Sequence, residues 1–348
     1  MRFSELSLAA QTAYAELAEQ TRAFEATNAL GGLVGSFQKL DRKGQAYWYF
    51  SYREPGGKGR MSYVGPDDER VRALIERFRR SRREKPLAPQ ARSAIALGCA
   101  ATVPKHFRIV KRLADYGFFR AGGVLVGTHA FIAYGNLLGV RWEHGSSTLD
   151  VDFAHAGRNV SIALPADLRI DVHGALESLE MGLLPLTEFE GGAGAQYRNP
   201  DDQELRLDFV TSAVRKGRAV VMRDLNLALE PLKFMEFSLE GTTQGCVFGA
   251  AGACTVNLPT PERYAVHKLI VHGERPASER PKARKDLLQS ASLAGYLLHA
   301  GEARAFNRAL NDGLARGTGW KKRIRAGKAA LLAIAPDLDV PSLWKEKT

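Results

Sequence analysis

Two carboxylates stand one residue apart inside an apolar run of the sequence, at Asp150 and Asp152. Because residues i and i+2 of a strand point to the same face, both carboxylates would project from one side, while Leu149, Val151 and Phe153 face the other. Like charges this close repel, and burying them without a partner costs roughly several kcal/mol, so a bound divalent cation would relieve them. The pattern therefore predicts a metal site. A solvent-facing pair on an edge strand is the alternative.

A Gly-Thr pair upstream joins an apolar run to a helical pattern. Residues 121–126 predict a buried strand and residues 128–138 predict a helix. A turn made of Gly127 and Thr128 would present unpaired backbone N–H groups and a hydroxyl at the positive end of that helix, which suits a phosphate. An ordinary tight turn, with Thr128 as the N-cap, would use the same residues.

These features, an apolar strand, Gly-Thr, a helix and then Asp-x-Asp, resemble the DNA polymerase β-like nucleotidyltransferase superfamily. The resemblance implies a third carboxylate on a later strand, and Asp208 in the alternating run 204–210 matches it. It further implies that Asp150, Asp152 and Asp208 bind Mg²⁺ or Mn²⁺ and that a nucleoside triphosphate is the substrate.

More specifically, the chain is similar to the bacterial branch that includes the AbiEii-type toxins of toxin–antitoxin pairs. In that branch a Pro-rich strand end leads into a helix carrying a Lys, followed by a basic segment with a Lys-Asp pair. Here Lys268 follows the segment 258–267, and Lys285 and Asp286 follow later. The resemblance implies that Lys268 and Asp286 bind the nucleotide. A solvated helix lysine and a surface ion pair are the alternatives.

The predicted function is a metal-dependent nucleotidyltransferase. Asp150 and Asp152 would hold the metal against the phosphates, and Asp208 would complete a second metal site or act as general base on the attacking hydroxyl. Attack on the α-phosphate would expel pyrophosphate. RNA, including tRNA in a toxin-like role, is one acceptor that fits. A protein or small-molecule acceptor, or an inactive nucleotidyltransferase-like protein that binds nucleic acid, are the alternatives.

The composition favours a basic protein of more than one domain. The 348 residues carry 49 Lys and Arg against 38 Asp and Glu, a net charge of +11. Such an excess favours polyanionic partners such as RNA or DNA, although it also serves solubility. We expect an α+β fold with a nucleotidyltransferase-type mixed sheet flanked by helices. The predicted parts are a basic N-terminal region at 1–116, a catalytic core at 117–259 and a helical domain at 260–348.

The N-terminal region predicts a small sheet between helices. Its aromatic residues alternate with basic ones and could stack bases, but those on one strand face would form the core of a small sheet. The Arg-rich helix at its end is a candidate phosphate-tracking surface. The expected elements are a helix over 4–26, a meander of strands 37–40, 45–52 and 59–64, a helix over 67–83 capped by Asp67, a linker at 85–89, and helices over 91–101 and 104–116.

Other site classes find little support. The Gly clusters at 31–35 and 191–194 do not join a strand to a helix, which argues against a dinucleotide site. His129, His144, His155 and His173 lack zinc-ligand spacing and are expected to be structural, with His129 the exception most worth testing.

The cysteine content, the N-terminal residues and the lack of long apolar runs together predict a cytoplasmic location. The sequence contains three cysteines, too few and too irregularly spaced for a disulfide framework, which suggests a reducing cytoplasm. The N-terminus lacks the apolar core of a signal peptide, and no run of about 18 apolar residues predicts a membrane span. The sequence leaves the oligomeric state open.

Overall fold

The computed structural model covers the chain with eight described segments. These are residues 2–28, 35–42, 44–53, 59–83, 87–156, 170–186, 194–212 and 218–346. Three features considered above lie partly outside them: the Gly cluster at 31–35, the linker at 85–89 and the Gly cluster at 191–194, of which residues 31–34, 85–86 and 191–193 are not described.

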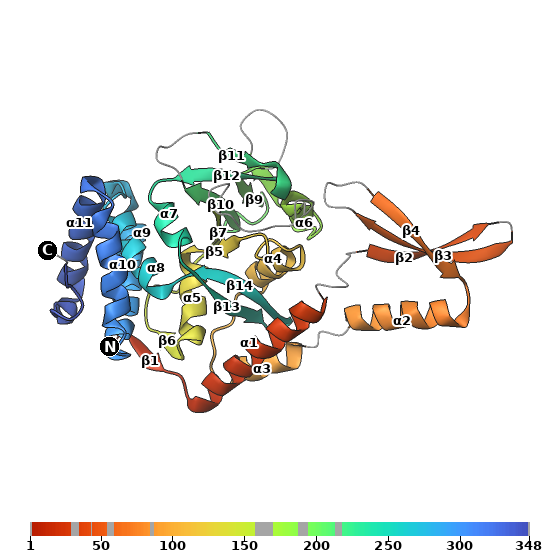
Figure 1. Ribbon diagram of the computed structural model, residues 1–348, viewed down its shortest axis with the longest axis horizontal. Helices are drawn as coiled ribbons and strands as arrows, with labels where there is room; N and C mark the ends of the chain where they lie inside the picture. Colours follow the sequence, from red (N-terminus) through yellow and green to blue (C-terminus); the bar gives the residue numbers. More distant parts are fainter. Residues whose placement is uncertain are drawn as a thin grey trace.

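A mixed sheet forms the centre of the molecule (Figure 1). Its main path runs β11-β12-β10-β7-β5, in which β10 lies parallel to both β7 and β12, while β5 and β11 are antiparallel to their neighbours. The antiparallel pair β8 and β9 extends the sheet along the first half of β10. The strands are β5 (Gly123–Leu125), β7 (Asp150–His155), β8 (Leu184–Leu186), β9 (Gln196–Arg198), β10 (Arg206–Ser212), β11 (Val220–Met222) and β12 (Leu227–Leu232).

Apolar side chains on one face fix the register of the two central strands. Phe153 of β7 and Phe209 of β10 are cross-strand partners, and their rings stack with centroids 5.1 Å apart at an interplanar angle of 18°. Both are fully buried, together with Val151 and Leu207. Because side chains alternate along a strand, this register brings the intervening polar residues of β7 and β10 side by side on the opposite face.

Helices and a hairpin enclose the sheet. α5 (Gly127–Leu137) follows β5 directly, and the hairpin of β13 (Thr242–Gly249) and β14 (Gly252–Pro259) packs beside it. α1 and α3 cover that hairpin through a second core that includes Tyr14, Leu17 and Phe248. The remaining elements of this part are β1 (Phe3–Glu5), α1 (Leu8–Asn28), α3 (Ala88–Ala96), α4 (Pro104–Asp115), β6 (Val140–Trp142), α6 (Val172–Glu177), η2 (Arg223–Leu225) and α7 (Met235–Leu239).

The N-terminal helix begins later than its sequence predicted. Residues 3–5 form β1, which pairs antiparallel with β6, and Leu6 N donates to Gly139 O at 2.8 Å. The helix starts at Leu8, and Ser7 Oγ accepts from Ala10 N at 3.2 Å in the manner of an N-cap. Long-range pairing with β6 therefore overrides the helical pattern at the first residues.

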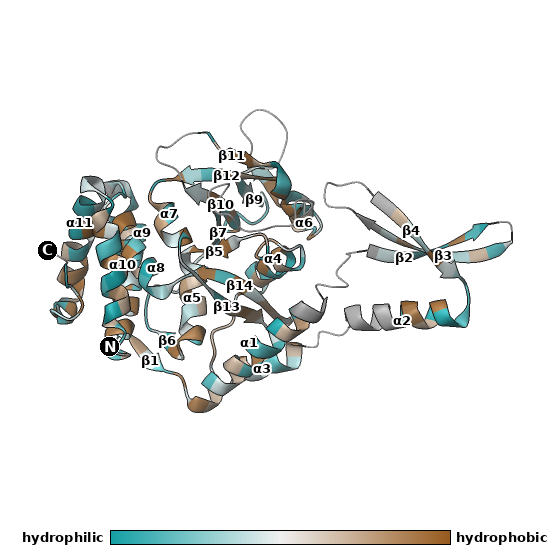
Figure 2. Cartoon of the chain, viewed as in Figure 1, coloured by the Kyte–Doolittle hydropathy of each residue, from teal (hydrophilic) through white to brown (hydrophobic). Residues whose placement is uncertain are grey.

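The C-terminal helices share the main core with the sheet. Tyr264, Leu269 and Leu293 are buried in the same apolar cluster as Phe153. In Figure 2, α10 shows brown and teal patches, as expected of a helix with one buried side. These elements are α8 (Pro261–His272), η3 (Ala277–Glu279), α9 (Arg280–His299), α10 (Ala303–Ala315), α11 (Thr318–Ile334) and η4 (Pro336–Leu338).

Residues 35–83 form a separate extension that we call the arm. The predicted meander is confirmed: β2 (Gly35–Arg42), β3 (Gln45–Arg53) and β4 (Gly59–Pro66) are antiparallel in that order, followed by α2 (Glu69–Arg83). Figure 1 shows the arm projecting from the end of the molecule opposite the C-terminal helices. The predicted cap residue is wrong by one position, because Asp68 Oδ1, and not Asp67, accepts from Val71 N at 2.8 Å.

The expected α+β class, with its meander, mixed sheet and C-terminal helices, is confirmed. The boundaries at 116/117 and 259/260 stay predictions, and the packing of α1 and α3 on the β13–β14 hairpin places parts of the N-terminal region against the central body. Within the described residues, no helix has the length and apolar character needed to cross a membrane.

Candidate active site

Three carboxylates lie on one face of the β7–β10 pair. Asp152 and Asp208 are direct cross-strand partners, and Asp150 is paired with Arg206. Arg206 Nε lies 3.8 Å from Asp150 Oδ1. All three carboxylate residues are half-buried, in contrast to their fully buried apolar neighbours. The structure thus brings together Asp150 and Asp152, whose spacing predicted a metal site, and Asp208, which the family resemblance implied.

The surroundings of these carboxylates disfavour their ionised forms. Burial, followed by the charge of Asp152, raises the pKa of Asp208 to about 6. Burial also raises the pKa of Asp152, the charge of Asp150 adds to the increase, and Lys268 opposes it. Each shift has the same physical origin: negative charge is held away from water and beside more negative charge.

A divalent cation fits this arrangement. Oδ1 of Asp208 is buried and has no hydrogen-bond partner, and a buried carboxylate oxygen without a donor is costly unless a cation occupies the site. In the described part of the chain, no three His, Cys, Asp or Glu side chains already converge as a complete metal cage. Mg²⁺ usually takes one or two carboxylates and completes its shell with water and substrate phosphates, so Asp152 and Asp208 supply what it needs from the protein.

The N-terminus of α5 meets the same carboxylates. Gly127 has φ of +61°, and a β-carbon added there would lie 1.9 Å from Asp152 Oδ2. Val126 is the N-cap residue, makes no side-chain capping bond and donates its N–H to Asp152 O at 3.0 Å. The first turn of this eleven-residue helix therefore points its N–H groups toward the carboxylates and has no side-chain cap.

Thr128 differs from one of the two expectations for it. It is not the N-cap, since α5 already begins at Gly127. Its side chain is buried, and Thr128 Oγ1 accepts a hydrogen bond from Gln289 Nε2 at 3.3 Å. The hydroxyl thus contributes to the contact between α5 and α9, while phosphate binding by this residue stays a prediction.

Tyr264 and Gln289 brace the turn. The Tyr264 hydroxyl lies 2.8 Å from both Gly127 O and Gln289 Oε1. Gln289 is fully buried and also donates to Gly145 O at 2.8 Å. Sequence reasoning missed both residues. Their helical spacing from Lys268 and Asp286, four and three positions away, was the available signal that they share those faces.

Lys268 is held by a buried carboxylate. Its Nζ donates to Asp286 Oδ1 at 2.7 Å, and Arg275 Nε donates to the other oxygen of Asp286. The Asp286 side chain is 1% exposed and that of Lys268 is 12% exposed. Burial alone would raise the pKa of Asp286, but Lys268 and Arg275 hold it below its usual range. The surface ion pair considered above is therefore wrong for Asp286, which positions Lys268; direct nucleotide contact by Asp286 stays a prediction.

Two further lysines of α9 face the carboxylates. Lys285 and Lys282 both lower the pKa of Asp152, as Lys268 does. The Lys285 ammonium lies 3.4 Å from Ser147 O, close to the start of β7. Burial and the positive charge of Lys268 lower the pKa of Lys285. The site thus combines a negative sheet face with a positive wall of α8 and α9.

Three of the four histidines considered above, His129, His155 and His173, have structural surroundings, whereas His144 is exposed. His129 Nε2 lies 3.0 Å from His106 Nδ1 in a buried pair, and burial lowers the pKa of His129 to about 3. His155 Nε2 lies 2.7 Å from Ala121 O, and His173 Nδ1 lies 3.1 Å from the Tyr197 hydroxyl. His129 therefore packs behind the first turn of α5 as a neutral side chain.

Comparisons with known proteins find a matching family and one similar solved structure. A family model described as a nucleotidyltransferase matches residues 105–315. A search of curated proteins finds no match. A nucleotidyltransferase-like antigenic protein from Paracoccidioides brasiliensis, known from its crystal structure, aligns at 16% identity and a TM-score of 0.38 over 72% of this chain and 97% of that one. Because the family match covers more than half of the sequence and includes all three carboxylates, the chain belongs to this nucleotidyltransferase family.

Proposed function

We propose that this protein transfers a nucleoside monophosphate from a nucleoside triphosphate to an acceptor hydroxyl. The observation that carries the proposal is the pairing of Asp152 with Asp208 in register, facing the uncapped N-terminus of α5. Carboxylates, helix N–H groups and lysines around one space are the parts needed to hold a triphosphate during transfer.

Asp152 and Asp208 would hold a divalent cation, with Asp150 at the edge of the same face. When bound, Mg²⁺ or Mn²⁺ would neutralise charge on the phosphate oxygens. Asp150 is drawn toward Arg206, so its contribution depends on a shift of its side chain away from that guanidinium.

The triphosphate would be held from two sides. Backbone N–H groups in the first turn of α5 supply donors at the positive end of a helix dipole. Lys268 and Lys285, whose charges reach Asp152, supply point charges from α8 and α9. Asp286 keeps the ammonium of Lys268 in place.

Asp208 is suited to take a proton from the acceptor. Without a bound metal its pKa is about 6, so the carboxylate is ionised at neutral pH yet more basic than an ordinary aspartate. A cation on this carboxylate would lower its basicity, so Asp208 would act as general base where Asp152 carries the metal, and as a metal ligand otherwise. The acceptor oxygen forms a bond to the α-phosphorus, the bond from that phosphorus to the β-phosphate bridging oxygen breaks, pyrophosphate leaves, and the hydroxyl proton passes to Asp208.

RNA is the acceptor that the net charge of +11 favours. The AbiEii-type toxin role, the use of ATP in particular and a cytoplasmic location are further predictions from the sequence.

The test is a transfer assay with the full-length chain. The protein is incubated with Mg²⁺, total cellular RNA and each of the four nucleoside triphosphates labelled at the α-phosphate. We expect labelled RNA and release of pyrophosphate, both lost in Asp152→Asn and Asp208→Asn. The exposed Asp201→Asn serves as the matched control with full activity. If no triphosphate labels RNA, protein or the enzyme itself and no pyrophosphate appears, the protein is not a nucleotidyltransferase under these conditions and the proposal fails.

A further inference from the structure

The two faces of the arm's sheet differ. Side chains alternate along β3, so Trp48 points to one face while Tyr47 and Tyr49 point to the other. α2 covers the Trp48 face, where Ile75 is 2% exposed. The aromatic residues that alternate in the sequence are thus divided between a small core and a face that α2 does not cover.

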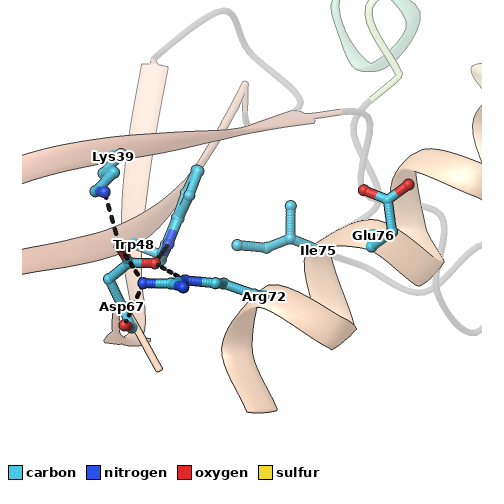
Figure 3. A pocket seen from close by; sticks show the side chains of 6 residues that line it. All are labelled: Lys39, Trp48, Asp67, Arg72, Ile75 and Glu76. Atoms are coloured by element: carbon cyan, nitrogen blue, oxygen red, sulfur yellow. Dashed lines mark hydrogen bonds and ion pairs between the residues drawn. The ribbon is translucent and has the colours of Figure 1, made fainter. Parts of the chain in front are cut away.

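The covered face is held together by Asp67. Trp48 Nε1 donates to Asp67 Oδ1 at 2.8 Å, and Arg72 Nε donates to the same oxygen at 2.7 Å. Lys39 Nζ lies 2.7 Å from Asp67 Oδ2. Figure 3 shows these side chains converging on Asp67 from β2, β3 and α2. Sheet and helix are therefore fastened together, which makes the opposite face a preformed surface.

Three tyrosines occupy that opposite face. Tyr63 of β4 is 58% exposed. Its ring centroid lies 5.6 Å from that of Tyr49 and 6.0 Å from that of Tyr47. The guanidinium of Arg42 lies 5.6 Å from the Tyr49 ring centroid. Together with Gln45 these residues line a concavity of about 630 Å³. Tyr47 and Tyr49 are half-buried, so together with the exposed Tyr63 they leave ring surface open in this concavity, as a site for flat ligands requires.

The charge of the arm narrows the class of ligand. Residues 35–83 contain 13 Lys and Arg against six Asp and Glu, an excess of seven within a chain whose net charge is +11. Sugars also stack on aromatic rings, but a neutral sugar gains nothing from such a charge. The tyrosine rings call for flat groups that can stack, and the excess positive charge calls for a polyanion. Single-stranded nucleic acid offers both, because its bases are unpaired and its backbone is charged.

We propose that the tyrosine face of the arm, formed by Tyr47, Tyr49 and Tyr63 with Arg42, binds single-stranded nucleic acid. Unpaired bases stack on the tyrosine rings, Arg42 beside them contacts the phosphates, and the net positive charge of the arm attracts the polyanion over a longer range. In a duplex the bases are already stacked on each other, so this face prefers single strands. Binding at the arm requires neither a nucleotide substrate nor transfer, and the proposal stands apart from the proposed function.

The test measures binding by fluorescence anisotropy without nucleoside triphosphate or divalent cation. The probes are a labelled unstructured RNA of about 16 nucleotides, a length near known single-strand site sizes, the matching DNA, and an RNA duplex of that sequence. Tyr49→Ala and Tyr63→Ala remove one ring each. Tyr49→Phe and Tyr63→Phe, the matched controls, keep the ring. Thermal unfolding of every variant verifies that the chain is folded.

We expect each alanine variant to weaken single-strand binding by about tenfold, with the phenylalanine variants within about twofold of the wild type. Duplex binding should change little, and comparison of the RNA and DNA probes shows which polymer is preferred. Equal binding by the alanine variants and the wild type overturns the proposal. An equal loss of affinity for the single strand and the duplex in the alanine variants also overturns it, because it would indicate binding by charge without stacking. An equal loss of single-strand affinity in the alanine and phenylalanine variants overturns it as well, because the phenylalanine variants keep the ring. A change in oligomeric state with unchanged single-strand binding would assign the face to a second copy of the chain and would also overturn it.

Discussion

Gly127 lies against the carboxylate of Asp152, so closely that a β-carbon on the glycine would be 1.9 Å from Oδ2. The contact joins the first turn of α5 to the face of the sheet that carries the three carboxylates. Glycine is required at this position for two reasons: a β-carbon would clash with Asp152, and φ of +61° lies in the left-handed region that residues with a side chain disfavour. Gly127 therefore allows the N-terminus of α5 to lie close to the carboxylate of Asp152.

Gly127→Ala is expected to lose most transfer activity. The added methyl must displace Asp152 or the start of α5, and a displacement of about 1 Å can cost roughly a hundredfold in rate. The left-handed backbone alone costs roughly 1–2 kcal/mol of stability. Gly301→Ala is the control, since Gly301 has φ of +76° and no atom within 4 Å of its added β-carbon. Equal loss of activity in both variants would show that backbone strain, and not the contact with Asp152, is responsible.

Asp208→Asn is expected to stabilise the metal-free protein at neutral pH. The folded pKa of about 6 is above the unfolded value near 3.9, so between these values the folded state binds more protons and its stability falls as pH rises. The variant removes this cost. A difference of about two pKa units corresponds to at most roughly 3 kcal/mol, and partial exposure of the carboxylate reduces this value. The melting temperature of the variant should therefore exceed that of the wild type by several degrees at pH 8, and the difference should vanish toward pH 4.

The measurement is thermal unfolding in chelator from pH 4 to pH 8. Asp201→Asn, an exposed aspartate, should follow the wild-type curve throughout. A difference between Asp208→Asn and wild type that does not depend on pH would contradict the raised pKa. Added Mg²⁺ should stabilise the wild type and not the variant, and this effect should weaken as pH falls through about 6.

The carboxylates could be predicted because their signal is local. Asp150 and Asp152 lie in a period-two pattern within one strand, and this fixes their common face before any tertiary contact is known. The pairing with Asp208 is not local: it depends on β10 joining β7 in parallel, with β8 and β9 between them in the chain. Only the resemblance to a family supplied that third residue.

The wrong details arose where two neighbouring residues could fill one role. Either Asp67 or Asp68 could cap α2, and the choice depends on Trp48 and Lys39, which reach Asp67 across the sheet. From the local sequence Thr128 could serve as an N-cap, but in the structure its hydroxyl accepts a hydrogen bond from Gln289, which is 161 residues away in the chain. Long-range contacts of this kind leave no pattern in the local sequence.

Asp67→Asn is expected to loosen the arm without affecting the central body. The hydrogen bonds from Arg72, Lys39 and Trp48 hold the pKa of Asp67 well below its usual range. Its contribution is therefore fully present above about pH 4 and is lost as pH falls below that value. Hydrogen exchange at pH 7 should be faster in β2–β4 of the variant. Asp41→Asn, an exposed residue on the same arm, is the control. Unchanged exchange in the arm would show that Asp67 does not fasten it.

Asp286→Ala is expected to reduce both stability and turnover. The substitution leaves Lys268 and Arg275 without their buried partner, and breaking a buried pair in this way costs roughly 3–5 kcal/mol. Because the pKa of Asp286 is lowered, its contribution is present above about pH 4 and lost at lower pH. Turnover should fall tenfold or more, about 1.4 kcal/mol, if Asp286 acts by holding Lys268.

A double-mutant cycle with Lys268→Met separates positioning from stability. If Asp286 acts only through Lys268, the double variant should turn over no more slowly than Lys268→Met alone, measured at a temperature where all variants are folded. Glu279→Ala is the control, because Glu279 pairs with Arg275 at 2.6 Å but not with Lys268. Additive losses in the cycle would mean that Asp286 acts on the reaction independently of Lys268. Near-normal turnover of folded Asp286→Ala would remove it from the site and leave Lys268 to hold the triphosphate without it.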